Sequence, residues 1–167
     1  MDINKLFWAG RTVLYKGLFN SYGNYCYMGK PVSIRGKKRI TIGNKVRIYP
    51  GVRMEAIDKG QIIIEDNVSI AQNFHVTAAS RLVIEKNTTI SGNVFITDID
   101  HEYRELGKHI LDQPMLVKDT VIGENCFIGF GAAIQAGTKL GKHCIVGTNA
   151  VVRGIFPDYS VIVGVPA

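Results

Sequence analysis

Aliphatic residues return at every sixth position towards the end of the chain, at Ile122, Ile128, Ile134, Leu140, Val146 and Val152. Glycine follows four of them, at positions 123, 129, 141 and 147. An amphipathic helix needs an apolar residue every three or four positions, and a half-buried strand needs one at every second position. A period of six with glycines instead favours short strands separated by tight turns.

Three such hexads make one triangular coil, so residues eighteen positions apart are expected to stack. Ile122 then lies over Leu140, and Cys126 lies over Cys144. Small residues suit a narrow prism, and glycine takes the positive φ that a sharp corner can demand. The pattern therefore predicts a parallel β-helix.

The repeat resembles the hexapeptide-repeat acyltransferases, whose left-handed β-helices form trimers. The resemblance runs from about Ile42 to the end, and it is carried by Val-Ile-Gly-Glu-Asn-Cys-Phe-Ile-Gly, Ile-Val-Gly-Thr-Asn-Ala-Val-Val and Ile-Val-Gly-Val-Pro-Ala. These segments look most like the sugar O-acetyltransferases, although Phe127 stands where many members have tryptophan. The resemblance implies an all-β, left-handed parallel β-helix, a homotrimer, acetyl-CoA as acyl donor and a carbohydrate acceptor.

The chain divides into an N-terminal cap segment, 1–41, and the hexapeptide repeats, 42–167. The first part lacks the hexads but mixes apolar residues such as Leu6 and Phe7 with Lys5 and Arg11, which is typical of an amphipathic helix. We expect it to close the open end of the β-helix, with attachment to a membrane surface as the alternative. No run is long enough for a membrane span, and no signal-peptide cleavage pattern is present.

The repeat is interrupted most strongly after Ile96, where the next aliphatic is due at 102 but the count restarts at Ile122, twenty residues later. The inserted loop, 98–118, is rich in acids, histidines and other polar residues. Long loops on a rigid scaffold are more often functional than not. This loop is therefore where we expect the chemistry.

The formal net charge is +6, which favours anionic partners such as a coenzyme or sugar nucleotide. The basic residues are scattered and no nucleic-acid-binding motif is present, so no nucleic-acid partner is expected. Cys26, Cys126 and Cys144 show neither CxxC nor zinc spacing, which favours buried free thiols in a reducing cytoplasm.

The segment Phe95-Ile96-Thr97-Asp98-Ile99-Asp100-His101-Glu102-Tyr103 is similar to the one that carries the catalytic histidine in sugar and maltose acetyltransferases. The resemblance gives that role to His101, as the general base that deprotonates an acceptor hydroxyl. Imidazole has a suitable pKa for this step. Asp98, Asp100 and Glu102 all compete to orient the imidazole; Asp98 ranks first, because an Asp three places before the histidine recurs in the related enzymes.

The other histidines match no catalytic motif. His143 falls in a polar turn and His109 in the inserted loop, whereas His75 is expected to point outward and to line the groove.

The resemblance also implies sites for the two substrates. Asn73 aligns with an asparagine that contacts the acceptor sugar in the galactoside enzyme, although corner asparagines are also common for backbone reasons. Acetyl-CoA is expected along the last coils, at Gly129, Phe130, Gly147, Thr148 and Arg153. Arg153 is the candidate phosphate ligand, and no metal is implied.

The sequence therefore predicts an O-acetyltransferase of cell-surface polysaccharides, such as capsule or O-antigen. An N-acetyltransferase on an amino sugar or sugar nucleotide is the main alternative, and a non-catalytic scaffold is the second. A γ-type carbonic anhydrase shares the β-helix but needs three converging histidines, which this chain does not present.

Overall fold

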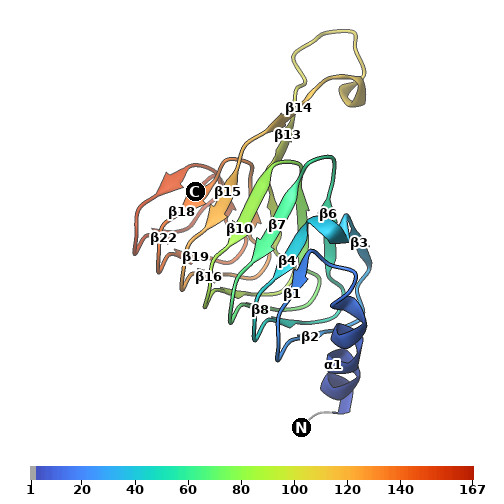
Figure 1. The fold of residues 1–167 in the computed structure, drawn as a ribbon. Coiled ribbons are helices and arrows are strands. Elements are labelled where there is room, and N and C mark those ends of the chain that lie inside the picture. The colour runs from blue at the N-terminus through green and yellow to red at the C-terminus, as the bar shows by residue number, and fades with distance from the viewer. Residues whose placement is uncertain (1–2) are drawn as a thin grey trace.

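Residues 3–167 are described by a computed structural model. The chain winds through three parallel sheets in turn, forming a left-handed β-helix with a triangular cross-section (Figure 1). Within those residues, no helix is long and apolar enough to cross a membrane.

The first sheet contains β1 (Ser21–Tyr22), β4 (Ile40–Ile42), β7 (Gln61–Ile64), β10 (Arg81–Ile84), β15 (Thr120–Ile122), β18 (Lys139–Leu140) and β21 (Ile155–Phe156). The second contains β2 (Tyr27–Met28), β5 (Arg47–Ile48), β8 (Ser69–Ile70), β11 (Thr89–Ile90), β16 (Phe127–Ile128), β19 (Ile145–Val146) and β22 (Val161–Ile162). The third contains β3 (Ser33–Arg35), β6 (Arg53–Ala56), β9 (His75–Ala78), β12 (Phe95–Thr97), β17 (Ala133–Ile134) and β20 (Val151–Val152). Two 3₁₀ turns, η1 (Lys37–Arg39) and η2 (Ile110–Asp112), lie outside the sheets.

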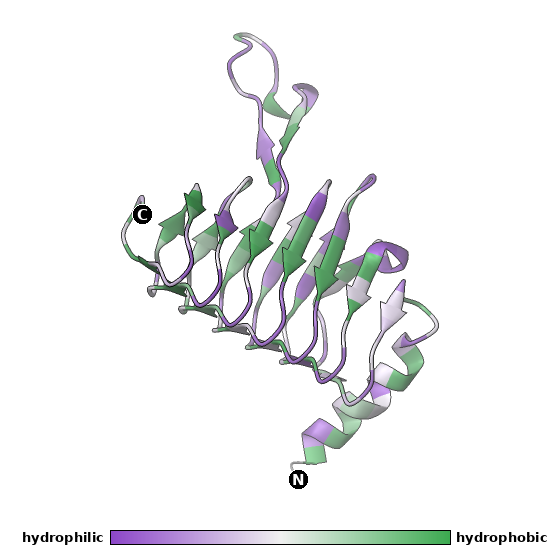
Figure 2. Ribbon diagram, turned by 60° about the vertical axis from the view of Figure 1, so that its left-hand side comes forward, coloured by the Kyte–Doolittle hydropathy of each residue, from purple (hydrophilic) through white to green (hydrophobic). Residues whose placement is uncertain are grey.

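The expected stacking is confirmed by the strand register. Ile122 pairs with Leu140 on the first sheet, and Ile128 pairs with Val146 on the second. The aliphatic side chains at these positions are buried in the core. Figure 2 shows hydrophobic residues along the strands and hydrophilic residues in many of the connecting turns. Cys26, Cys126 and Cys144 are buried free thiols, so the cysteines pack as small core residues.

The β-helix begins about twenty residues before the first clear hexad. β1 pairs with β4 through Ser21 and Thr41, so the first coil lies inside the segment that the hexads leave as a cap. Its inward positions are taken by Tyr22, Cys26 and Met28, which hide the aliphatic period.

The helix expected in the N-terminal segment is α1 (Ile3–Tyr15), and it packs against the first coil (Figure 1). Trp8 contacts the rings of Tyr27 and Tyr49, with centroids 5.9 and 5.7 Å away. The Thr12 hydroxyl and the Arg11 guanidinium lie within hydrogen-bonding distance of main-chain carbonyls of the first coil, at Cys26 and Met28. The helix thus covers the end of the prism as expected, while residues 1–2 of the cap lie outside the described part.

The inserted loop is an antiparallel hairpin that projects far from the prism (Figure 1). Its strands are β13 (Ile99–His101) and β14 (Met115–Val117), paired so that His101 lies opposite Met115. We call residues 98–118 the arm.

Candidate active site

A cavity of about 640 Å³ lies where the arm leaves the third sheet. The sheet supplies its floor and the arm supplies one wall. The lining residues are Arg53, Glu55, Ile57, His75, Thr77, Phe95, Thr97, Ile99, Asp100, His101, Tyr103, Met115, Gln135, Ala136 and Arg153. The volume is typical of a small-molecule site.

Asp98 attaches the base of the arm to the preceding coil. Its side chain is completely buried, and its two carboxylate oxygens accept hydrogen bonds from the backbone N–H groups of Ala79 and Ser80, at 2.8 and 2.9 Å. Burial raises the pKa of this carboxyl, while the two N–H donors act in the opposite direction. Within residues 3–167 no hydrogen bond joins Asp98 to His101, and the two Asp98 oxygens bind the backbone of the preceding coil instead, so the expected role of Asp98 in orienting His101 stays a prediction.

Further hydrogen bonds fix the return strand of the arm. The main-chain N–H of Lys118 donates to the carbonyl of Asp98 at 2.9 Å, and the Thr120 hydroxyl donates to the carbonyl of Thr97 at 2.9 Å. Ser80 also donates its hydroxyl to the carboxylate of Asp119. Both ends of the arm are therefore tied to the same corner, which makes its base a rigid support for β13.

His101 lies on β13, and its exposed side chain lines the cavity. Its backbone N–H donates to Oδ1 of Asp100 at 2.9 Å, but its imidazole makes no hydrogen bond within residues 3–167. The ring nitrogens thus remain available to an incoming hydroxyl, which a general base requires. His101 was expected at the junction of a strand and the inserted loop, and it lies at the end of β13, the first strand of the arm.

Asp100 connects the arm to the third sheet. Its Oδ2 lies 3.3 Å from a guanidinium nitrogen of Arg153, which follows β20. Both side chains are about half exposed, so this ion pair adds little to stability. It does place Arg153 in the cavity, facing a carboxylate of its own chain.

His75 is a second imidazole in the same cavity, and it points outward as expected. Its Nε2 and the Thr77 hydroxyl are hydrogen-bonded at 3.1 Å, and its ring centroid lies 5.0 Å from that of Phe95. Burial and then the charge of Arg53 lower its pKa, outweighing the opposing effect of Glu55. A lowered pKa keeps the ring neutral, the form that can accept a proton.

Arg53 and Glu55 are functional candidates that the sequence analysis missed. They form an ion pair at 2.8 Å, and the hydrogen bond from Arg53 lowers the pKa of the Glu55 carboxyl. Arg53 lies beside His75 and His75 beside Phe95 in the strand register. Strand alternation could have identified them in the sequence, because every second residue of a third-sheet strand faces outward.

The residues expected to hold acetyl-CoA are divided between two corners of the prism. Arg153 lies in the cavity, but Gly129, Phe130, Gly147 and Thr148 lie at the corner between the second and third sheets, outside the lining. The backbone is so close there that a Cβ on Gly129 would meet the Thr148 nitrogen at 2.7 Å. Phe130 is 46% exposed at this corner.

Asn73 lies at the same distant corner. Its φ is 58°, a left-handed conformation that asparagine tolerates. Its side-chain amide donates to Oδ1 of Asn93 at 3.0 Å, joining two coils. Asn73 therefore does not line the cavity of its own chain, and the structural role of a corner asparagine fits its contacts.

Metal chemistry has no preformed site in the described part of the chain. Within residues 3–167, no group of three or more histidine, cysteine or acidic side chains is placed to hold a metal ion.

Comparison with known proteins agrees with the fold and the repeat. Residues 119–154 match the family model described as "Bacterial transferase hexapeptide (six repeats)". The chain is 32% identical to WbbJ of Escherichia coli (strain K12), assigned by its name to lipopolysaccharide biosynthesis as an O-acetyl transferase, over 94% of this chain and 83% of that protein. It is 26% identical to a galactoside O-acetyltransferase of the same organism, over 93% of this chain and 65% of that one.

Among solved structures, the fold is similar to AntD, an N-acyltransferase from Bacillus cereus in complex with dTDP and 3-hydroxybutyryl-CoA. The TM-score is 0.81 at 20% identity, covering 93% of this chain and 84% of AntD. At that identity the likeness concerns the fold.

We predict that Asp98→Ala loosens the arm. The substitution leaves the N–H groups of Ala79 and Ser80 without their acceptor, which should lower the free energy of unfolding by about 1–3 kcal/mol. Amide hydrogen exchange across residues 99–117 should accelerate, as measured by mass spectrometry. Asp112→Ala, on the exposed η2 turn of the arm, is the matched control and should leave exchange at the arm base unchanged. Unaltered exchange in Asp98→Ala would show that the arm is held by other contacts.

Proposed function

Because this chain belongs to the family of bacterial hexapeptide-repeat transferases, we propose that it moves an acetyl group from acetyl-CoA to a sugar hydroxyl in cell-surface polysaccharide biosynthesis. The observation that carries the proposal is the imidazole of His101, unbonded among the described residues 3–167, on the wall of a cavity suited to a small molecule. Similarity to an O-acetyl transferase over nearly the whole chain supports the choice of reaction.

His101 acts as the general base in this proposal. A sugar hydroxyl is scarcely ionised near neutral pH, so its oxygen attacks the thioester carbonyl as an imidazole nitrogen removes its proton. The carbon–sulfur bond then breaks, and the departing thiolate receives a proton, for which the imidazolium is the available donor. Within residues 3–167 the cysteines are buried in the core, which favours direct transfer over an acyl-enzyme on cysteine.

The cavity and the residues expected to hold the coenzyme lie at different corners of one chain, and they can form one site if that site is shared by two subunits. One subunit supplies the arm, His101 and the third sheet, while a neighbour presents its own corner of Gly129, Phe130, Gly147 and Thr148 to the coenzyme. The glycines at this corner allow successive coils to stack closely, and the exposed ring of Phe130 offers the coenzyme an apolar contact. Arg153 is the candidate ligand of a coenzyme phosphate. To reach a phosphate, its guanidinium has to give up the ion pair with Asp100.

A trimer is supported by an apolar column on the second sheet. Phe127, Ile145 and Val161 lie side by side in register on three successive coils, and they are 46%, 48% and 70% exposed. A contiguous apolar surface of this kind marks an interaction site.

Acetyl-CoA as donor and buried free thiols both suit the cytoplasm, where we place the enzyme.

We predict that the protein sediments as a trimer of its 18.4 kDa chain. Phe127→Glu combined with Ile145→Glu should give monomers, because two carboxylates would be buried without partners. Leu106→Glu, at a 95% exposed position of the arm, is the control that keeps the trimer. A wild-type protein that sediments as a monomer at micromolar concentration would overturn both the trimer and the shared site.

We predict that turnover with acetyl-CoA yields esters on sugar hydroxyls. Purified enzyme would be offered a panel of hydroxyl sugars, amino sugars and sugar nucleotides, with release of the free coenzyme thiol as the readout. Mild alkali separates the products, because esters are cleaved and amides persist. Amides alone would establish the N-acetyltransferase alternative, which the AntD-like fold also accommodates. No turnover and no thermal shift with coenzyme A would establish a scaffold.

We predict that His101→Ala lowers turnover by about 10² to 10⁴ fold, the usual contribution of a general base. Acetyl-CoA affinity should stay nearly unchanged, because the base meets the acceptor. His109→Ala, also on the arm, is the matched control and should retain near-normal turnover. A large loss in His75→Ala with full activity in His101→Ala would transfer the role of base to His75.

A further inference from the structure

The outer surface of α1 carries an apolar stripe that the fold leaves uncovered. Trp8, Thr12 and Tyr15 lie on the side that contacts the first coil. Ile3, Leu6, Phe7, Val13, Leu14 and Leu18 are between 48% and 74% exposed. They recur at the three- and four-residue spacing of one helix face, continued into the turn after α1. We call these six residues the α1 stripe.

Charge is concentrated at the same end of the molecule. Residues 1–54 contain 11 basic residues and one acidic residue, a net charge of +10. Residues 55–167 contain 9 basic and 13 acidic residues, a net charge of −4. Because coils stack in sequence order, this division along the chain is also a division along the axis of the prism.

Several lysines lie beside α1 or on the first coil. Lys38 donates to the carbonyl of Gly17 at 2.9 Å, and Lys16 donates to the side chain of Asn24 at 2.7 Å. Lys30 and Lys37 belong to the first coil. Among the residues of α1 itself, 3–15, there is no acidic side chain.

We propose that the α1 end of the prism docks on an anionic membrane surface. A helix with one apolar face and neighbouring basic residues lies in the plane of the lipid interface, with its apolar side chains inserted below the headgroups. At 1.5 Å per residue, α1 presents this face over a length of about 20 Å. Charge complementarity selects the occupant, because an anionic lipid surface attracts basic residues at the end that bears the α1 stripe.

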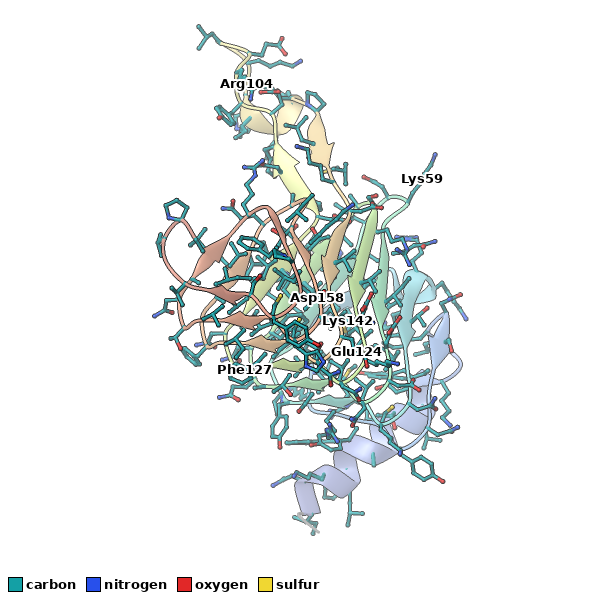
Figure 3. All side chains as sticks on the ribbon, turned by 90° about the vertical axis from the view of Figure 1, so that its left-hand side faces the viewer. Lys59, Arg104, Glu124, Phe127, Lys142 and Asp158 are labelled. Carbon is teal, nitrogen blue, oxygen red and sulfur yellow. The ribbon has the colours of Figure 1, made fainter. Side chains whose placement is uncertain are left out.

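This docking leaves the arm free. The arm leaves the third sheet in the middle of the prism and points away from α1 (Figure 1), and Arg104 lies near its outer end (Figure 3). The inference is independent of the proposed acyl transfer, since it uses none of the residues that line the cavity.

The test is co-sedimentation of the full chain with lipid vesicles. Wild-type protein should bind vesicles of phosphatidylcholine with 30 mol% phosphatidylglycerol, and binding should fall as salt screens the lysines. Phe7→Ser combined with Leu14→Ser should weaken binding by at least about tenfold. Leu106→Ser with Leu111→Ser, at two exposed apolar positions on the arm, is the matched control and should bind like the wild type.

Charge is tested separately by Lys30→Glu with Lys37→Glu. Each lysine near an anionic surface is worth about fivefold in affinity, so this pair should also lose at least about tenfold. Lys59→Glu with Lys139→Glu changes the net charge equally but lies away from α1, and it should have little effect; Lys59 is labelled in Figure 3.

The outcomes separate the possible occupants of the stripe. Equal binding by the Phe7→Ser/Leu14→Ser variant and the wild type, or no binding to anionic vesicles, overturns the proposal. So does a lower sedimentation mass of that variant without lipid, which would make the α1 stripe an interface between copies. Circular dichroism checks that the variants stay folded, as expected because Trp8, Thr12 and Tyr15 are retained.

Discussion

Main-chain hydrogen bonds between successive coils are the constraint on which this protein depends. On the first sheet, the N–H of Gly43 donates to the carbonyl of Ile64, Glu65 to Ile84 and Glu85 to Ile122, at 2.8–2.9 Å. Such a parallel ladder allows no slip, because a shift of one residue would turn every inward side chain outward. Each coil therefore has to repeat the inward residues of the last, and the resulting prism is narrow and rigid.

The ladder also decides where the chain can vary. The strands have fixed partners, whereas the corners can lengthen without disturbing them, and the arm is inserted at one of these corners. Asp98 makes this insertion rigid at its base by satisfying two N–H groups of the preceding coil. A buried carboxylate with two backbone donors is costly to disturb. The arm can then project from the prism while its first residue stays hydrogen-bonded to the preceding coil.

The cavity is built from two structural parts, the third sheet and the arm. The third sheet arranges Arg53, His75 and Phe95 by strand register, so their spacing follows from the ladder. The arm brings His101 and Asp100 beside them, and the Asp100–Arg153 ion pair connects the two parts. The His75 imidazole is hydrogen-bonded to Thr77 within the sheet, whereas the His101 imidazole has no hydrogen-bond partner among residues 3–167. Strand register positions the residues of the cavity floor, and the arm positions the residues of its wall. The sequence of the arm can therefore vary while the β-helix stays the same.

The sequence by itself determined the β-helix, the inward positions and the inserted loop, because a six-residue period is a local signal repeated many times, whereas the role of His101 was an expectation from family resemblance. It did not reveal that the first coil begins at Ser21, since Tyr22 and Met28 replace the aliphatic residues there. Only the tertiary structure decided that Asp98 binds the preceding coil and that the glycine corner lies apart from the cavity of its own chain. These are contacts between coils. A residue's partner there depends on how loops of unequal length bring neighbouring coils into register, and no local pattern of residues records that.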